Sequence, residues 1–147
     1  MQVKDVMKTD MITLKLDSTI SDAARLMRDH GIGFLPVCDE NKRVQGVITD
    51  RDLVTRGLAE ERPLSSSVVD LMTLELVRCR PEDDVESAAA SMSDAHKGRM
   101  LVTGPNDVLE GIFSLSDLAD LDEVSAGETL RKVSTRENQG DGQREAR

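Results

Sequence analysis

The fold is decided by a stretch of sequence that occurs twice. It reads Gly46-Val47-Ile48-Thr49-Asp50-Arg51-Asp52-Leu53, and 65 residues later it returns as Gly111-Ile112-Phe113-Ser114-Leu115-Ser116-Asp117-Leu118. At the same offset the chain aligns from Val3–Leu53 to Val68–Leu118 without a gap, and identical pairs include Met7/Met72, Ala23/Ala88 and Met27/Met92. Chance does not keep one register over about fifty positions, so the chain contains two copies of one unit.

Each copy has the same order of predicted elements. A short apolar strand (11–14, 76–79) precedes a helix with apolar residues at helical spacing, and a hairpin of two strands (34–37 and 44–48, 100–102 and 108–113) follows. A second helix begins near Thr49 and near Ser114. The order β-α-β-β-α, present twice, predicts a mixed α/β fold. A unit of about fifty residues buries little surface by itself, so we expect the two copies to pack on each other.

The repeat also sets the expected domain organisation. We expect a first repeat over residues 1–59, a linker over 60–67 and a second repeat over 68–122. Pro63 and three serines mark the linker. A C-terminal helical extension over 123–134 and a disordered tail over 135–147 follow. The alanine and methionine stripes of the first helices are expected in the core, and Gly31 is placed to end the first of these helices.

Composition excludes several classes of function. The 147 residues include 28 acidic and 19 basic ones, a net charge of −9, which disfavours binding to nucleic acid or to a membrane surface. Without Trp or Tyr, only two phenylalanines can stack on bases. No apolar run is long enough to span a membrane, and the first residues do not resemble a signal peptide, so we expect a cytoplasmic protein. Two cysteines are too few for a disulfide framework.

Catalysis is not expected. His30 lies beside the helix-ending glycine, where it is expected to be a helix-end partner. Cys38 follows a predicted strand and Cys79 falls in one, so both are expected to be structural. The acidic run 82–84 is interpreted as a helix cap and not as a metal site. The sequence therefore predicts neither a catalytic residue, nor a metal site, nor a catalytic cofactor.

The repeated turn has two interpretations. Thr49 followed by Asp52, and Ser114 followed by Asp117, match a capping box that satisfies the first amides of a helix. The same turn can bind a ligand, because helix-start N–H groups attract an anion and an ionised carboxylate accepts two hydrogen bonds from a ribose diol. In that interpretation the aspartates contact the sugar, and the hydroxyls lie nearer the phosphate.

The ordered set of these motifs, present twice, resembles a tandem pair of CBS domains, the module named after cystathionine β-synthase and also called a Bateman module. The matching stretches include 3–7, 23–27, 33–37 and 46–53 in the first copy and 70–72, 99–102 and 111–118 in the second. The resemblance implies two β-α-β-β-α CBS repeats packed by pseudo-two-fold symmetry. It also implies adenosine-containing ligands in two clefts between the repeats, and a homodimer that forms a four-repeat disc. Leu101 departs from the pattern, because the family usually has the proline seen at Pro36.

The resemblance implies which residues form the clefts. Cleft A would combine Thr49, Arg51 and Asp52 with Leu76, Val77, Gly98, Arg99 and Met100. Cleft B would combine Ser114, Ser116 and Asp117 with Met11, Ile12, Gly33, Phe34 and Leu35. Because Arg51 and Arg99 can clamp phosphates, cleft A is expected to bind nucleotides more tightly than cleft B.

Two functions therefore remain open. The first is a regulatory module that binds AMP, ADP or ATP as a regulatory ligand and acts in trans on an effector protein, with S-adenosylmethionine or NAD as alternative ligands. The second is a structural or protein-interaction module that binds no ligand. Retention of the hydroxyl–aspartate pair in both copies favours the first.

Overall fold

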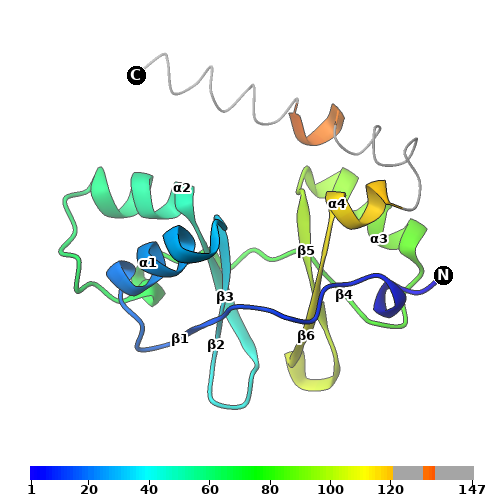
Figure 1. Cartoon of the computed structure of the whole chain (residues 1–147), viewed down its shortest axis with the longest axis horizontal. Coiled ribbons are helices and arrows are strands. Elements are labelled where there is room, and N and C mark those ends of the chain that lie inside the picture. The colour runs from blue at the N-terminus through cyan, green and yellow to red at the C-terminus, as the bar shows by residue number, and fades with distance from the viewer. Residues whose placement is uncertain (121–130, 135–147) are drawn as a thin grey trace. The chain divides into compact units, whose positions relative to one another are not determined.

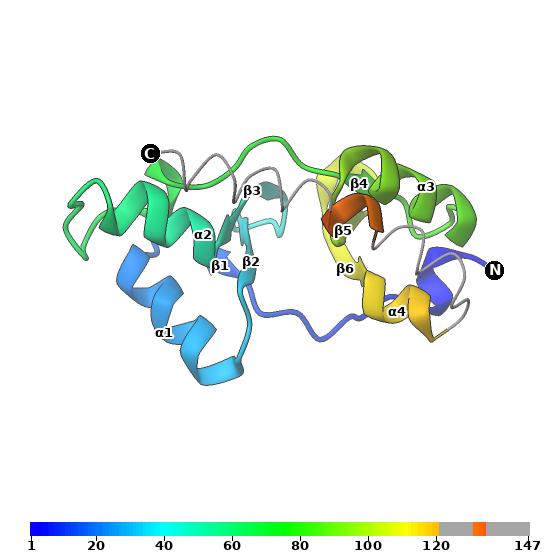
Figure 2. The same cartoon turned by 90° about the horizontal axis from the view of Figure 1, so that it is seen from above.

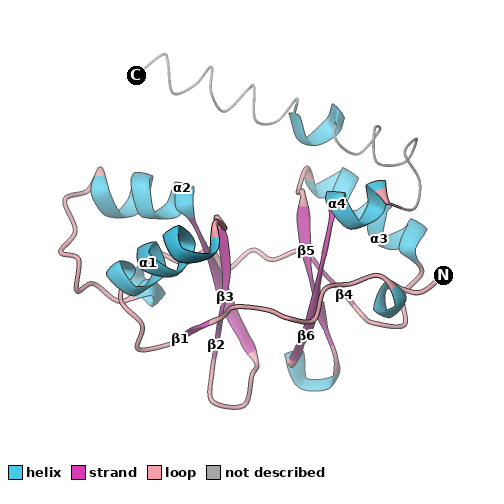
Figure 3. Cartoon of the chain, viewed as in Figure 1, coloured by secondary structure: helices cyan, strands magenta, loops and turns pink. Residues whose placement is uncertain are grey.

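The computed structural model describes residues 1–120 and 131–134, and within them it contains two three-stranded sheets, ordered β1-β2-β3 and β4-β5-β6 (Figure 1). The strands are β1 (Leu14–Lys15), β2 (Phe34–Cys38), β3 (Val44–Thr49), β4 (Arg78–Cys79), β5 (Arg99–Thr103) and β6 (Leu109–Ser114). The helices are α1 (Ile20–His30), α2 (Asp50–Asp52), α3 (Val85–Ala95) and α4 (Leu115–Ala119). The order β-α-β-β-α in each repeat confirms the predicted mixed α/β class (Figure 3).

Strand pairing follows the connections between strands. β1 and β2 run parallel, since α1 crosses over between them, whereas β2 and β3 form an antiparallel hairpin in which Leu35 faces Ile48. β4 and β5 are likewise parallel. The first strand of each repeat is shorter than predicted, because residues 11–13 and 76–77 lie outside β1 and β4.

The ends of α1 are set by local chemistry. Thr19 and Asp22 form a capping box, in which the Asp22 N–H donates to Thr19 Oγ1 at 3.1 Å and the Thr19 N–H donates to Asp22 Oδ2 at 2.9 Å. The hydrogen bond from the Thr19 N–H, together with the Thr19 side chain, keeps the pKa of the Asp22 carboxyl below its usual range. At the other end Gly31 adopts φ +64°, which confirms that this glycine ends the helix.

The ends of α3 follow the same plan with different residues. Asp84 caps the helix by accepting a hydrogen bond from the Glu86 N–H at 3.1 Å, so the acidic run acts as a cap, as predicted. His96 stands where the first repeat has Gly31, and it adopts φ +56°. Its Nδ1 lies 2.8 Å from the carbonyl oxygen of Lys132.

Each sheet is covered on one face by the helices of its own repeat, α1 and α2 on the first sheet and α3 and α4 on the second (Figure 2). Ala23 and Met27 of α1 and Ala88, Ala89 and Met92 of α3 are buried in these interfaces, which confirms them as core residues. The prediction was wrong for Ala24, which is exposed on α1. The buried side chains of the two cores include Ile20, Ala23, Met27, Leu35 and Ile48 in one and Val85, Ala88, Met92, Met100 and Phe113 in the other.

The first segment of each sequence repeat packs on strands of the other repeat. Val3 is fully buried in the core that contains α3, and its N–H donates to the Asp83 carbonyl at 2.9 Å. Val68 is fully buried in the core that contains α1, and its N–H donates to the Ser18 carbonyl at 3.0 Å. As a result one compact unit combines Met1–Asp10 with Val77–Gly104 and residues 110–120, and the other combines Met11–Leu76 with Pro105–Leu109.

The C-terminal predictions fall largely outside the described residues. Of the predicted helical extension over 123–134, residues 131–134 are helical and Val133 is buried, whereas 121–130 lie outside the described part. The predicted tail over 135–147 also lies outside it. In the described part of the chain, every helix is too short or too polar to cross a lipid bilayer.

Candidate functional site

The turn from β3 into α2 places Thr49 and Asp52 against each other. The Thr49 N–H donates to Asp52 Oδ2 at 3.0 Å, and the Asp52 N–H donates to Thr49 Oγ1 at 3.1 Å. This is a complete capping box, and only 8% of the Asp52 surface is exposed. The capping interpretation of this turn is therefore confirmed, and any ligand-binding role has to coexist with it.

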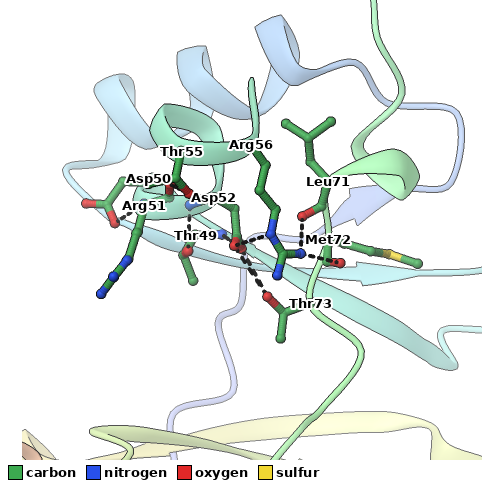
Figure 4. Close-up of polar contacts among 9 residues, drawn as sticks. All are labelled: Thr49, Asp50, Arg51, Asp52, Thr55, Arg56, Leu71, Met72 and Thr73. Atoms are coloured by element: carbon green, nitrogen blue, oxygen red, sulfur yellow. Dashed lines mark hydrogen bonds and ion pairs between the residues drawn. The ribbon is translucent and has the colours of Figure 1, made fainter. Parts of the chain in front are cut away.

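Asp52 also has partners from farther along the chain (Figure 4). The Thr73 hydroxyl lies 3.4 Å from Oδ1 and 3.3 Å from Oδ2 of Asp52, and Arg56 Nε lies 3.9 Å from Oδ1. Arg56 in turn donates from Nη1 to the carbonyls of Leu71 at 3.1 Å and Met72 at 3.4 Å. The carboxylate thus joins the start of α2 to the 71–73 segment. Neither Thr73 nor Arg56 belongs to the set of site residues predicted from the sequence.

The equivalent turn from β6 into α4 repeats the capping box with fewer partners. The Ser114 N–H donates to Asp117 Oδ2 at 2.8 Å, Ser114 Oγ donates to the same oxygen at 3.0 Å, and the Asp117 N–H lies 3.4 Å from Ser114 Oγ. Asp117 is as buried as Asp52, at 7% exposure. Among residues 1–120 and 131–134, no hydrogen bond to Asp117 Oδ1 is formed.

The helix-start amides are used within the protein in the first repeat. The Asp50 N–H donates to the Gly33 carbonyl at 3.0 Å, and the Arg51 N–H donates to Asp50 Oδ1 at 2.9 Å. Since the Asp52 N–H is also taken, these three N–H groups have partners within the protein, which contradicts the interpretation that the N–H groups of this helix start bind an anion. In the second repeat the Leu115 N–H donates to the Gly98 carbonyl at 3.0 Å.

Gly33 and Gly98, the two glycines predicted to line the clefts, each accept a hydrogen bond from the strand-to-helix turn of their own repeat. A Cβ on Gly33 would lie 2.7 Å from a carboxylate oxygen of Asp50, an exposed side chain that can move away. A Cβ on Gly98 would meet only a Leu115 methyl group at 3.5 Å.

The remaining predicted site residues differ in accessibility. Leu35 and Met100 are core side chains, 0% and 1% exposed, so these side chains are closed to a ligand. Arg51, Arg99 and Ser116 are exposed. The half-buried members of the predicted set are Met11, Ile12, Phe34, Leu76 and Val77.

The cysteines behave as structural residues. Burial, with a smaller contribution from Asp83, raises the pKa of the Cys79 thiol to about 11, and burial with Asp39 raises the pKa of the Cys38 thiol. Both thiols are buried, so neither is placed as a nucleophile. Within the described ranges, no three His, Cys, Asp or Glu side chains are grouped to ligate a metal ion.

The structure defines a tandem-repeat α/β protein, in which each copy has a capping aspartate at the same strand-to-helix turn. Comparison with known proteins gives the family: the CBS domain matches residues 3–58 and 68–123, so the chain belongs to the CBS-domain family. The CBS domain-containing protein YhcV of Bacillus subtilis is 34% identical over 134 residues, which are 90% of this chain and 94% of YhcV.

Two similar solved structures contain adenosine compounds. The structure of CBSX2 in complex with AMP is 26% identical, has a TM-score of 0.72, and is matched over 81% of this chain and 93% of that one. The CBS domain pair of protein MJ0100, in complex with 5′-methylthioadenosine and S-adenosyl-L-methionine, is 26% identical, has a TM-score of 0.71, and is matched over 82% and 94%. These ligands are properties of those two proteins.

Proposed function

We propose that this CBS pair is a regulatory module that binds adenosine-containing ligands. The observation that carries the proposal is that two CBS pairs with the same fold bind AMP or S-adenosyl compounds. The ribose is the part that these ligands share, and a carboxylate is the side chain that accepts both hydrogen bonds of its diol. The chain offers such a carboxylate at the same turn of each repeat.

The proposed ligand contacts are made by the residues predicted from the sequence. Leu35 and Met100, whose side chains are buried, would contribute backbone groups only. One ligand would use Thr49, Arg51 and Asp52 with Leu76, Val77, Gly98, Arg99 and Met100. The other would use Ser114, Ser116 and Asp117 with Met11, Ile12, Gly33, Phe34 and Leu35. Asp52 and Asp117 accept the ribose hydroxyls in this proposal, and the exposed Arg51 and Arg99 contact phosphates.

A second candidate function is a scaffold that binds no small molecule. The observation that favours it is the burial of Asp52 and Asp117 inside their capping boxes, which already gives both carboxylates a structural role. In this alternative the aspartates stabilise helix starts, and nucleotides have no effect on the protein.

A thermal-denaturation screen distinguishes the two functions. AMP, ADP, ATP, NAD and S-adenosylmethionine are added in turn, and unfolding is followed by far-UV circular dichroism because the chain has no Trp or Tyr. A ligand present at 100 times its Kd stabilises the folded state by about 2.7 kcal/mol, which raises Tm by roughly 5–10 °C. The double variant with Asp52→Asn and Asp117→Asn should lose this increase. No increase with any compound would favour the scaffold.

Regulation in trans requires a surface for other proteins, and homodimerisation is part of the proposal. In the unit that contains α1, the apolar side chains of Leu58, Leu64 and Leu74 are 75%, 71% and 68% exposed. A protein contact would cover these side chains if they form one continuous apolar patch. Light scattering coupled to gel filtration tests the dimer, and a monomer at every concentration would contradict it. The effector and the cytoplasmic location stay predictions.

A further inference from the structure

Two residues occupy equivalent positions in the two repeats, and they differ in chemistry. Thr73 pairs with Val47 in β3, with hydrogen bonds of 2.8 and 3.1 Å in the two directions. Lys8 pairs with Ile112 in β6, with hydrogen bonds of 2.9 Å in both directions. Lys8 and Thr73 are 65 residues apart, as are Val47 and Ile112, so each pair occupies the same place in its own repeat.

Close packing fixes the backbone at both positions. A Cβ on Gly46 would lie 2.7 Å from the Met72 sulfur and 3.0 Å from the Thr73 carbonyl oxygen. A Cβ on Gly111 would lie 2.5 Å from the Met7 sulfur and 2.9 Å from the Lys8 carbonyl oxygen. The segment thus lies against a glycine in both units, and the backbones of Thr73 and Lys8 have matching surroundings.

The Thr73 side chain forms hydrogen bonds with Asp52, whereas the equivalent Lys8 side chain forms no ion pair with Asp117 within the described residues. The Thr73 hydroxyl lies within 3.4 Å of both oxygens of Asp52, with Arg56 at 3.9 Å. Lysine has no hydroxyl, and within the described part of the chain Lys8 forms no ion pair with Asp117 inside 4.0 Å. Lys8 is exposed. A ribose diol at Asp52 therefore meets an oxygen pair that already accepts from Thr73, whereas within residues 1–120 and 131–134 Asp117 Oδ1 accepts no hydrogen bond.

We propose that Thr73 and Lys8 determine which of the two aspartates binds the ligand: Thr73 competes with the ribose at Asp52, and the Lys8 ammonium contacts the phosphate of a ligand whose ribose is on Asp117. This inference rests on the proposed function. It predicts tighter binding at Asp117 than at Asp52, the reverse of the order of affinities expected from Arg51 and Arg99 alone. Those arginines would contact phosphates, and they would not affect the competition between Thr73 and the ribose for Asp52. Charge at Lys8 also supplies the positive group that the predicted set around Ser114 lacks.

Isothermal titration calorimetry of the full chain with AMP and with adenosine tests the inference, since adenosine lacks the phosphate. Wild-type protein should show one dominant binding event, which Asp117→Asn removes and Asp52→Asn does not. Thr73→Val removes the competing hydroxyl and should raise the affinity of the Asp52 site about tenfold for both compounds. Thr73→Ser restores the hydroxyl and should restore the weak affinity.

Two matched variants control for general effects. Thr55→Val makes the same substitution at a hydroxyl that donates to the Arg51 carbonyl at 2.8 Å and not to Asp52, and it should leave both affinities unchanged. Lys8→Ala should lower AMP affinity about tenfold without changing adenosine affinity, and the loss should shrink with added salt. Lys4→Ala removes an exposed charge from the same segment and should change neither. Circular dichroism confirms that each variant is folded.

The outcomes separate this inference from the proposed function. If Asp52→Asn removes AMP binding and Asp117→Asn does not, the inference is overturned and the proposed function stands. The inference also fails if Thr73→Val weakens binding, or if Lys8→Ala lowers adenosine and AMP affinity equally. If neither the wild type nor any variant binds an adenosine compound, both are overturned.

Discussion

Replacing Gly46 by alanine tests how the Val68–Thr73 segment packs on β3. The added methyl group would meet the Met72 sulfur at 2.7 Å, its Cγ at 2.9 Å and the Thr73 carbonyl oxygen at 3.0 Å. Gly46 does not have a positive φ, so the substitution introduces no backbone strain and its cost in the folded state is steric.

The magnitude follows from these contacts. Forcing an extra methyl group into a filled site costs about 1–3 kcal/mol. The carbonyl oxygen belongs to the pair of hydrogen bonds between Thr73 and Val47, and weakening these adds roughly 0.5–1.5 kcal/mol. We therefore expect Gly46→Ala to lower the free energy of unfolding by about 2–4 kcal/mol, a decrease in Tm of roughly 5–15 °C.

Urea denaturation followed by far-UV circular dichroism measures this change. Gly98→Ala is the matched control, because its Cβ would meet only Leu115 Cδ1 at 3.5 Å, an ordinary van der Waals contact. A double-mutant cycle with Met72→Ala identifies the contact, since truncation of Met72 should remove about half of the cost of Gly46→Ala. The reasoning is refuted if Gly46→Ala stays within about 0.5 kcal/mol of wild type.

Three further predictions concern other parts of the fold. Gly31→Ala should cost about 1 kcal/mol in urea denaturation, because Gly31 has φ +64°; an unchanged midpoint would contradict this. The thiols of Cys79 and Cys38 should react with a disulfide reagent at pH 8 only after unfolding, since burial raises both pKa values, to about 11 for Cys79; rapid labelling of the native protein would be inconsistent with this burial. Thr49→Ala and Ser114→Ala each remove a cap and should cost about 0.5–2 kcal/mol without ligand, while equal stability to wild type would show that these caps contribute nothing.

The fold could be predicted because its signals are local and occur twice. Apolar spacing predicted the helices, and Gly31 predicted the end of α1 to the residue. The hairpins followed from two apolar runs around a polar turn. The first strands were predicted too long, because apolar character alone does not show where pairing with β2 and β5 begins.

The candidate site could be predicted only in part because its partners are distant in sequence. Thr49 and Asp52 are three residues apart and were found as a motif, whereas Thr73 reaches Asp52 from 21 residues away. The packing of the Val68–Thr73 segment on β3 creates that contact. A signal for it did exist, since Met72 and Gly46 both recur at the offset of the repeat, but their meaning depends on knowing that the sulfur lies over the glycine.

Burial of the two aspartates does not by itself distinguish a ligand sensor from a scaffold, because a carboxylate has two oxygens. A helix cap needs only one of them. At Asp117 that oxygen is Oδ2, which takes the hydrogen bonds from both the N–H and the hydroxyl of Ser114. At Asp52 the cap also uses Oδ2, but the Thr73 hydroxyl contacts both oxygens and Arg56 lies beside Oδ1. Within the described residues the two aspartates therefore differ at Oδ1, which has Thr73 and Arg56 beside it in Asp52 and accepts no hydrogen bond in Asp117, although the two caps are alike.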